Sequence, residues 1–550
     1  MNEVFDAGQS TAFFAPVASD LFDSLIGQYN ADHAKIREIG ELAQGQAFRS
    51  AVSYFIAGNQ VDSQRYNSLG RLEDLFQVEG ATKALNSAYW QKALDLTDVI
   101  ELMPQARRDE WSTAIREHTT PDFTEDAVRP TLQNLLSMRQ QFLAEKIDGI
   151  FRGLSGEHVT NAPEAFGKRM IIQRVRTSYD TINTSTAGLI HDLRCVIARF
   201  MGRDEARWSS TDTVLDECKA NTGQWVVVDG GALRVRTYKN GNGHMEIHPD
   251  MAWRLNMMLA HLYPTAIPAN FRQKPPKPRK EFGTLMRPLP FAVIDILHGC
   301  LYRRRWAKDN HVSFDFTSSD RNGRAREEAS RVLEAIGGTQ NRAGGYFDFD
   351  YRPDAVLREI VISGCLPDRV AFQFYPTPES IVKVLVELAD IQDGDTVLEP
   401  SAGHGAIAMR LPATRLDCVE LSDLHCAILE ARGFNTINAD FLSWADRVVA
   451  EGRRYNKIVM NPPFSDGRAR LHVEQAFKLL SAGGRLVSVV PASMRGMQFL
   501  PGVEIEWSRV YENEFKGTTA AVAIMTVQAT GRQAAPSDSP VMEQGLFELA

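Results

Sequence analysis

The stretch Thr396-Val397-Leu398-Glu399-Pro400-Ser401-Ala402-Gly403-His404-Gly405-Ala406-Ile407-Ala408 decides the fold of the C-terminal part of this chain. It begins as a short apolar run typical of a buried strand, passes into a glycine-rich turn and ends as the start of a helix. Glycines at 403 and 405 allow a tight turn and let the backbone come close to a ligand, as in nucleotide-binding βα units. Structural turns use the same residues, so this stretch alone does not define a site.

Two further strand-like runs carry acidic residues at their ends. Residues 416–419 end at Glu420, about where a ribose-binding acid is expected after such a glycine turn. Residues 436–439 end at Asp440, with Phe441 beside it. In an open α/β sheet, ligands bind at the carboxyl ends of the strands near the point where the strand order reverses, so we expect these groups to converge.

A fourth apolar run, residues 457–460, leads directly into Asn461-Pro462-Pro463-Phe464. The turn combines a carboxamide at the strand end with two prolines, which stiffen the backbone, and an aromatic ring. These groups predict a site for a flat molecule that bears an amino group. The sheet should present this turn at the same edge as the glycine turn.

Together these motifs resemble a class I S-adenosylmethionine-dependent methyltransferase, most closely the N6-adenine DNA methyltransferases, over residues 371 to 530. The order also matches, because residues 372–378 (Phe-Gln-Phe-Tyr-Pro-Thr-Pro) resemble the segment that precedes the glycine motif in that family. Runs at 485–490, 503–510 and 520–527 supply three more strands, of which we expect the last two to be antiparallel. The resemblance implies an α/β domain with a Rossmann-like seven-stranded sheet, S-adenosylmethionine as the cofactor and DNA as the partner.

The resemblance also implies which side chains hold the cofactor. Those residues are Phe374, Tyr375, Pro376, Thr377, Glu399, Gly403, Gly405, Glu420, Asp440 and Phe441. Glu420 would accept hydrogen bonds from both ribose hydroxyls, and Asp440 would accept one from the adenine amino group, with Phe441 against the ring. The two acids could also be ordinary solvated groups, and Phe374 and Tyr375 could belong to the core.

The chemistry of the implied reaction explains the Asn-Pro-Pro-Phe turn. The exocyclic amine of adenine is a poor nucleophile because its lone pair is delocalised into the ring. If the side-chain oxygen of Asn461 and the carbonyl of Pro462 accept its hydrogens, they favour a pyramidal nitrogen and stabilise the positive charge that develops there. Transfer is then direct and in line, and positioning supplies much of the acceleration. Phe464 would stack on a flipped base, with Phe515 on its other side, and Pro463 completes the catalytic set.

Other functions remain open for the same motifs. Many adenine-specific enzymes carry Tyr where this chain has Phe464. The same turn also serves enzymes that methylate amino groups of guanine in RNA and the amide of glutamine in proteins. A third possibility is a DNA-binding or interaction protein that keeps the fold without activity, although the intact motifs argue against it.

Length and composition agree with a multidomain globular protein. The chain has 550 residues, enough for several domains, and a formal net charge of −8, so any nucleic-acid contact must come from a local patch. It has no apolar stretch near the roughly 20 residues of a membrane span, and its acidic N-terminus lacks a signal-peptide pattern, so we expect a cytoplasmic location. The six cysteines form no Cys-x-x-Cys or zinc pattern, which predicts reduced structural thiols and no metal site.

The sequence divides into four regions. Residues 1–155 show helical periodicity and would serve assembly or DNA contact, or simply pack as a bundle. Residues 156–365 mix helix and strand, and they loosely resemble uncharacterised segments found beside methyltransferase domains in phage and plasmid proteins. Residues 366–530 form the methyltransferase domain, and residues 531–550 are predicted to be a flexible tail. The oligomeric state stays open.

A basic stretch stands out in the second region. Residues 271–308 carry ten Lys and Arg side chains against two acidic ones. Such a patch suits phosphates and would make binding sensitive to salt, although a solvated linker can have the same composition. The candidate nucleic-acid contacts are Lys274, Lys277, Arg279, Lys280, Arg303, Arg304 and Arg305.

Overall fold

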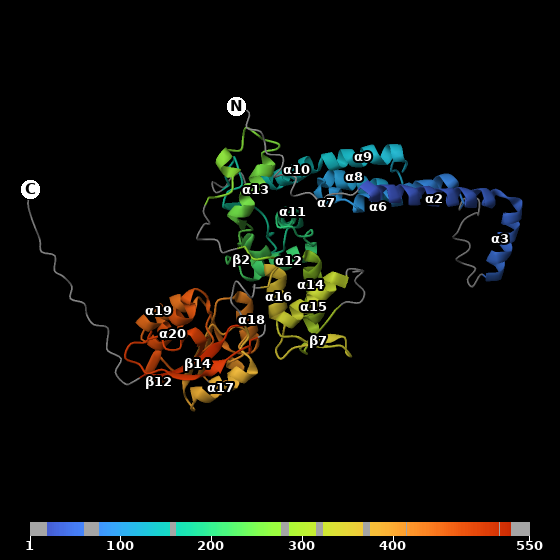
Figure 1. Ribbon diagram of the computed structural model, residues 1–550. Helices are drawn as coiled ribbons and strands as arrows, with labels where there is room; N and C mark the ends of the chain where they lie inside the picture. The colour runs from blue at the N-terminus through green and yellow to red at the C-terminus, as the bar shows by residue number, and fades with distance from the viewer. Residues whose placement is uncertain are drawn as a thin grey trace, which may run out of the picture. The chain divides into compact units, whose positions relative to one another are not determined.

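The computed structural model describes residues 19–59, 76–154, 161–276, 285–314, 323–366, 375–413, 415–515 and 518–529. Phe374, Lys277, Arg279, Lys280 and the predicted tail lie outside these residues. The chain forms two compact units, Met1–Val227 with Gly231–Gly283, and Val228–Gly230 with Thr284–Ala550 (Figure 1). The division lies near residue 283.

In the described ranges 19–59 and 76–152, the first unit is mainly helical, in keeping with the periodicity of its sequence. Its core centres on Trp90 and Phe123, both fully buried, whose ring centroids lie 5.3 Å apart. The helices that precede its sheet are α2 (Ser19–Gln44), α3 (Gln46–Asn59), α6 (Val78–Asp95), α7 (Val99–Leu102), α8 (Gln105–Arg116), α9 (Glu125–Ser137) and α10 (Arg139–Arg152).

A four-stranded sheet in the order β1-β4-β3-β2 follows in the same unit. Along β3, buried Leu233 and Val235 alternate with half-buried Arg234 and Arg236, so one face of the strand packs inward and the other carries arginines. The strands are β1 (Arg169–Ile172), β2 (Val226–Val228), β3 (Leu233–Thr237) and β4 (Gly243–Ile247). The helices are α11 (Thr184–Phe200), α12 (Trp208–Ala220) and α13 (Pro249–Leu259).

The second unit begins with three helices and a small antiparallel sheet in the order β5-β7-β6. The helices are α14 (Phe291–Arg303), α15 (Gly323–Ala335) and α16 (Asp354–Ser363), and a single 3-10 turn, η3 (Arg304–Trp306), continues α14. The strands are β5 (His311–Ser313), β6 (Thr339–Asn341) and β7 (Tyr346–Asp348). Helix α16 packs against α18 (Asp423–Ala431), which joins this part to the domain that follows.

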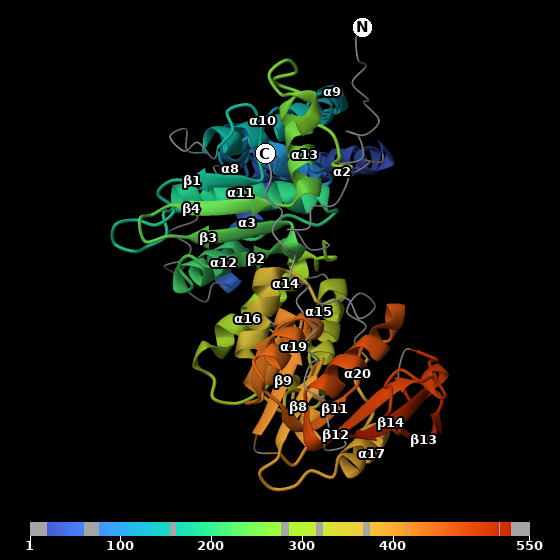
Figure 2. The same ribbon diagram turned by 90° about the vertical axis from the view of Figure 1, so that its left-hand side faces the viewer.

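The C-terminal domain is built on a seven-stranded sheet in the order β10-β9-β8-β11-β12-β14-β13, which confirms the predicted Rossmann-like sheet (Figure 2). Neighbouring strands from β10 to β12 are parallel, whereas β14 is antiparallel to both β12 and β13, as predicted for the last pair. The strands are β8 (Thr396–Pro400), β9 (Arg415–Glu420), β10 (Asn435–Asn438), β11 (Tyr455–Met460), β12 (Leu480–Pro491), β13 (Glu506–Tyr511) and β14 (Val522–Gln528).

Helices cover both faces of this sheet, because alternate side chains of each strand point to opposite sides. Leu398 and Ile458 pack with α19 (Phe441–Ala450) and α20 (Arg468–Lys478), whereas their neighbours Val397 and Val459 pack with α17 (Glu379–Ala389). Figure 1 shows α19 and α20 on one side of the sheet and α17 on the other. Strands buried on both faces explain the nearly continuous apolar runs in the sequence.

The predicted helix after the glycine turn is wrong. Among the described residues between β8 and β9, only a single 3-10 turn is found, η4 (Ala408–Arg410). Pro412 limits the length of any helix here, because a proline disfavours helical geometry in the preceding residue, and Leu411 is extended. The glycine turn is therefore held by its contacts with neighbouring strands and side chains.

The six cysteines are buried and none forms a disulfide. Across the residues that the structure describes, no helix is both long and apolar enough to cross a membrane.

Candidate active site

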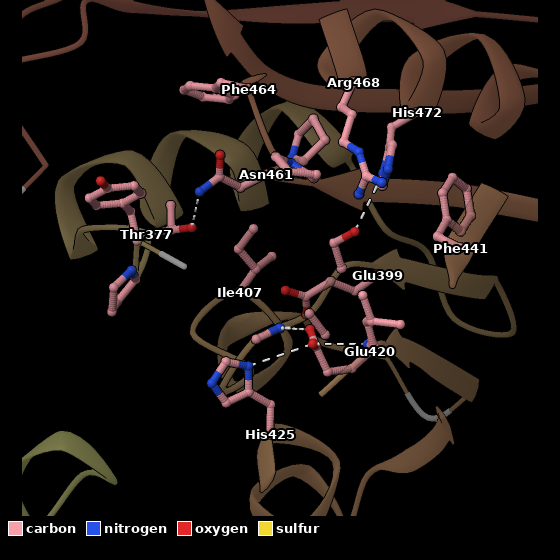
Figure 3. A pocket seen from close by; sticks show the side chains of 18 of the residues that line it. Thr377, Glu399, Ile407, Glu420, His425, Phe441, Asn461, Phe464, Arg468 and His472 are labelled. Carbon is pink, nitrogen blue, oxygen red and sulfur yellow. Dashed lines mark hydrogen bonds and ion pairs between the residues drawn. The ribbon is translucent and has the colours of Figure 1, made fainter. Parts of the chain in front are cut away.

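A cavity of about 760 Å³ opens at the carboxyl ends of β8, β9, β10 and β11 (Figure 3). Nearly all the described residues that the sequence singled out for cofactor and catalysis line it. They are Tyr375, Pro376, Thr377, Glu399, Gly403, Glu420, Asp440, Phe441, Asn461, Pro462, Pro463, Phe464 and Phe515. Gly405 is not part of the wall, and its role is to let the turn pack.

Backbone conformation explains both glycines of the turn. Gly403 and Gly405 have positive φ angles of 56° and 78°, which residues with a side chain rarely adopt. A Cβ at position 405 would also lie 2.8 Å from Leu429 Cδ2 on α18. Ser401 reaches a positive φ of 58° without being glycine, so the turn is held by its surroundings.

Arg432 provides part of that support from outside the cavity. Its guanidinium donates to the carbonyl of His404 in the turn and pairs with Asp350, with an Nη2–Oδ1 distance of 2.9 Å. The same group lies 5.1 Å from the centroid of the Tyr351 ring. Asp350 and Tyr351, just before α16, therefore hold Arg432 in place, and Arg432 in turn supports the glycine turn.

The Glu420 carboxylate organises the neighbouring strand end. Oε2 accepts the N–H of Gly403 at 2.8 Å, and Oε1 accepts those of Leu421 and Ser422 at 2.9 Å each. His425 Nδ1 lies 3.6 Å from Oε1. Burial alone would raise the pKa of Glu420, but His425 and the backbone donors outweigh it and hold the pKa below its usual value. Glu420 is therefore ionised in the cavity wall.

Glu399 shows the opposite behaviour at the adjacent strand end. It is only 2% exposed, and its Oε2 is buried without a hydrogen-bond partner in the described structure. Burial, opposed by a hydrogen bond from the Ala408 backbone and reinforced by the charge of Glu420, raises its pKa well above the usual value. An unsatisfied acidic oxygen in the wall fits a ligand that brings a positively charged donor.

Asp440 and Phe441 form the next part of the wall. Asp440 is the N-cap of α19, where its Oδ1 accepts the N–H of Ser443 at 3.0 Å. Phe441 is buried in the core, and its ring centroid lies 5.2 Å from that of His472 on α20. The cap uses one oxygen of Asp440 and so fixes the carboxylate at the cavity edge. The other oxygen is not needed to close the helix.

The carboxamide of Asn461 is fixed by Thr377. Its Nδ2 donates to the hydroxyl of Thr377 at 3.1 Å, and Figure 3 shows the amide oxygen pointing away from that contact. Pro462 is buried behind it, while Phe464 is half-buried and packs against the cores on both faces of the sheet. The amide oxygen is thus the end left to accept a hydrogen bond from a ligand.

Phe515 lines the cavity but is also a buried member of the core on the α17 face of the sheet. The two residues that follow it lie outside the described structure. Its side chain therefore has a packing role whether or not it contacts a base.

Several residues of the cavity wall were not predicted from the sequence. They are Ser401, His404, His425, Arg468 and His472. Burial, aided by the charge of Arg468 and opposed by that of Asp440, lowers the pKa of His472 to about 4, so this ring is neutral near pH 7. Single histidines carry no spacing pattern, although Ser422 followed by His425 is a readable helix start that places the ring near Glu420.

The basic candidates separate into different groups. Lys274 in the first unit is exposed, and Arg303 and Arg305 in the second unit are exposed as well. Arg304 is only 3% exposed, so its predicted contact with nucleic acid is wrong. Its guanidinium pairs with Asp309 and Asp354 and donates to the carbonyls of Asp309 and His311, which makes it part of the fold.

Comparison with known families agrees with the geometry of this site. Residues 380–514 match the family described as the methyltransferase small domain, and residues 82–265 match a domain of unknown function, DUF4942. The C-terminal part of the chain is therefore a class I methyltransferase domain, as the sequence predicted, and its cofactor is S-adenosylmethionine. Glu399 fits that cofactor, because the ammonium of its methionine half is the charged donor that Oε2 lacks.

Two curated methyltransferases are similar to parts of this chain. The type II restriction enzyme and methyltransferase RM.BcgI of Heyndrickxia coagulans is 26% identical over 148 residues, 21% of this chain and 23% of that protein. Ribosomal RNA small subunit methyltransferase A of a Synechococcus species is 31% identical over 101 residues, 17% of this chain and 36% of that protein. The chain thus spans well under half the length of either relative.

Among solved structures, TrmN from Thermus thermophilus is similar at 22% identity, over 27% of this chain and 48% of that chain. With a TM-score of 0.23, it adds nothing to the family match.

Proposed function

We propose that this protein transfers a methyl group from S-adenosylmethionine to the exocyclic N6 amine of adenine in DNA. The observation that carries the proposal is the Asn461 carboxamide, whose nitrogen is bound by Thr377 so that its oxygen remains to accept an amine hydrogen. A planar amine bound there loses conjugation with its ring and gains a lone pair for attack. The acceptor oxygen also stabilises the positive charge that develops on nitrogen.

Two carboxyl groups hold the cofactor in this proposal. Bound S-adenosylmethionine supplies an electrophilic methyl group on its sulfonium. Glu420 accepts hydrogen bonds from the ribose hydroxyls with the lone pairs that its backbone partners leave, while Glu399 faces the ammonium. Asp440 accepts from the adenine amino group, and Tyr375, Pro376 and Thr377 border the methionine half.

The aromatic groups of the wall suit a base taken out of its stack. Phe464 is half-buried beside the carboxamide and lines the cavity, where its ring would stack on a base. Stacking on an aromatic side chain contributes about 1–3 kcal/mol, which offsets part of the few kcal/mol that flipping costs. Phe515 closes the opposite side.

DNA is the preferred acceptor for two reasons. RM.BcgI, the similar restriction enzyme, belongs to a class of proteins that acts on DNA. Exposed basic residues that include Lys274, Arg303 and Arg305 offer contacts to phosphates on a chain that is acidic overall. The recognition sequence and the biological role, whether self-protection, anti-restriction or regulation, are separate questions.

RNA is the second candidate acceptor. The similarity to a ribosomal RNA methyltransferase favours it, and Phe464 stands where many adenine-specific DNA enzymes have Tyr. The cavity accommodates either, since the Asn461 oxygen recognises a planar amine and not the sugar attached to it.

Methyl transfer with labelled cofactor tests the proposal. The purified protein is incubated with DNA, RNA or protein in parallel, and the methylated nucleoside or residue is identified by mass spectrometry. We expect N6-methyladenine in DNA, and at least a 100-fold loss in the Asn461→Ala variant, about the contribution of one oxyanion-type contact. Binding of S-adenosylhomocysteine to the variant controls for folding. Transfer only to RNA or protein, or equal transfer by the variant, refutes the proposed reaction.

A further inference from the structure

The turn that ends α14 displays two aromatic rings to solvent. Trp306 is 84% exposed and Tyr302 is 68% exposed, although large aromatic side chains are ordinarily mostly buried in folded proteins. The guanidinium of Arg305 lies 5.5 Å from the centroid of the Trp306 ring. Arg303 and Lys308 in the same short segment are exposed as well.

Buried Arg304 holds this segment in place. Its Nη2 donates to the carbonyl of Asp309 at 2.6 Å and lies 3.1 Å from Asp354 Oδ2 at the start of α16. With this side chain turned inward in a 3-10 turn, its neighbours on both sides face solvent. Arg352 adds a second tie, because its Nη2 donates to the carbonyl of Ala307 at 3.1 Å. The exposed rings therefore stand on an anchored turn.

The charge around the rings is positive. The segment 302–309 carries four basic side chains and one acidic one. Arg352 and Asp354, which bind this segment, bring the total to five basic and two acidic side chains. The two acids, Asp309 and Asp354, both pair with Arg304. Cations beside exposed ring faces form the combination that binds a nucleic-acid strand through its phosphates and its bases.

We propose that the anchored turn, residues 302–308, binds single-stranded DNA, with Tyr302 and Trp306 stacking on unpaired bases and Arg303, Arg305 and Lys308 contacting the flanking phosphates. This inference rests on the proposed function only in taking DNA as the partner. Bases of a duplex are stacked on one another and their faces are closed to side chains, so the rings select an unpaired strand. The cations alone would bind a duplex equally well.

Binding of fluorescently labelled DNA by anisotropy tests the inference on the full-length protein. The ligands are a mixed-sequence single strand and its duplex, titrated with the native chain and with a Tyr302→Ala, Trp306→Ala double variant. Stacking of about 1–3 kcal/mol per base predicts that the double variant binds the single strand at least about 10-fold more weakly. We expect its affinity for the duplex to change by less than about twofold, since the phosphate contacts remain.

Two further variants separate stacking from charge and from folding. Tyr179→Ala is the matched control, because Tyr179 is 89% exposed in the first unit and should leave both affinities unchanged. An Arg303→Gln, Arg305→Gln variant should bind both ligands more weakly. For the single strand, the slope of log affinity against log salt concentration should fall in magnitude by about 1.4, at about 0.7 per phosphate contact.

Equal binding of the single strand by the ring variant and the native chain overturns the inference, as does an equal loss on both ligands. Neither result bears on methyl transfer, which the Asn461→Ala comparison tests on its own. Conversely, the protein could transfer no methyl group to DNA and still bind the single strand through the two rings. That result would refute the proposed reaction but not the proposed binding surface.

Discussion

Replacing Glu420 with Gln should loosen the glycine turn before any cofactor is present. The carboxylate accepts the backbone N–H groups of Gly403, Leu421 and Ser422. A carboxamide has only one oxygen, so if that oxygen keeps Leu421 and Ser422, an NH2 group must face the N–H of Gly403. One charge-assisted hydrogen bond is lost and a buried donor is left unpaired, which together cost about 2–4 kcal/mol.

Hydrogen exchange measured by mass spectrometry can detect this locally in the full chain. A cost of about 2–4 kcal/mol corresponds to at least about 30-fold faster exchange in peptides that contain the Gly403 amide. Glu430→Gln is the matched control, because Glu430 is exposed on the same helix that follows Glu420. Exchange of the Glu420→Gln variant within about threefold of the native chain would refute the view that this carboxylate builds the turn.

The same network predicts a pH dependence with a defined sign. The folded-state pKa of Glu420 is depressed below its usual value of 4.5. The stabilisation is therefore fully present above 4.5 and is lost as the pH falls through the lower folded-state value. Protection of the Gly403 amide should decline in that acidic range in the native chain but not in the Gln variant.

Three other substitutions probe the site and its support. Thr377→Val removes the acceptor that orients Asn461, so kcat should fall about 3- to 10-fold, and equal kcat in the variant and the native chain would contradict that role; steady-state kinetics at saturating cofactor can check it. Arg304→Ala removes the buried partner of Asp354, which keeps Arg352 at 2.9 Å, and should destabilise the second unit by about 1–3 kcal/mol, measured by urea unfolding; unchanged stability would contradict the role of Arg304 in the fold. Glu399→Gln should stabilise the free protein at pH above 4.5, by an amount that grows with pH until the raised pKa is passed, because the folded native chain holds a proton that the unfolded chain has lost; unchanged stability would argue against the raised pKa.

The strands and their polar ends were predictable because their signals are local. Apolar runs mark buried parallel strands, and one topological rule places the ends of such strands together, which is how Glu420, Asp440 and Asn461 come to share a cavity. The helix expected after Gly405 is wrong because the local signal at 405–408 does not include Pro412, which keeps Leu411 extended and stops any helix at that point.

The inward turn of Arg304 could not be predicted from composition. A run of three arginines looks uniform in sequence, yet only the middle one meets Asp354, an acid fifty residues away that folding brings within 3.1 Å. Counting charges treats all three as surface groups. The direction of each side chain depends on tertiary partners, so the same run supplies both an anchor and exposed cations.

Glu399 and Glu420 stand at the ends of neighbouring strands, yet the structure shifts their pKa values in opposite directions. Three backbone donors and His425 surround the carboxylate of Glu420, which keeps it ionised despite burial. Glu399 has one backbone donor and an oxygen with no partner in the described structure, so burial keeps it protonated. The ionised acid therefore shapes the turn in the free protein, while the protonated acid acquires its charge when a cation enters. Arrival of the cofactor's ammonium should release a proton from Glu399, and for that reason binding should strengthen with rising pH until the raised pKa of Glu399 in the free protein is passed.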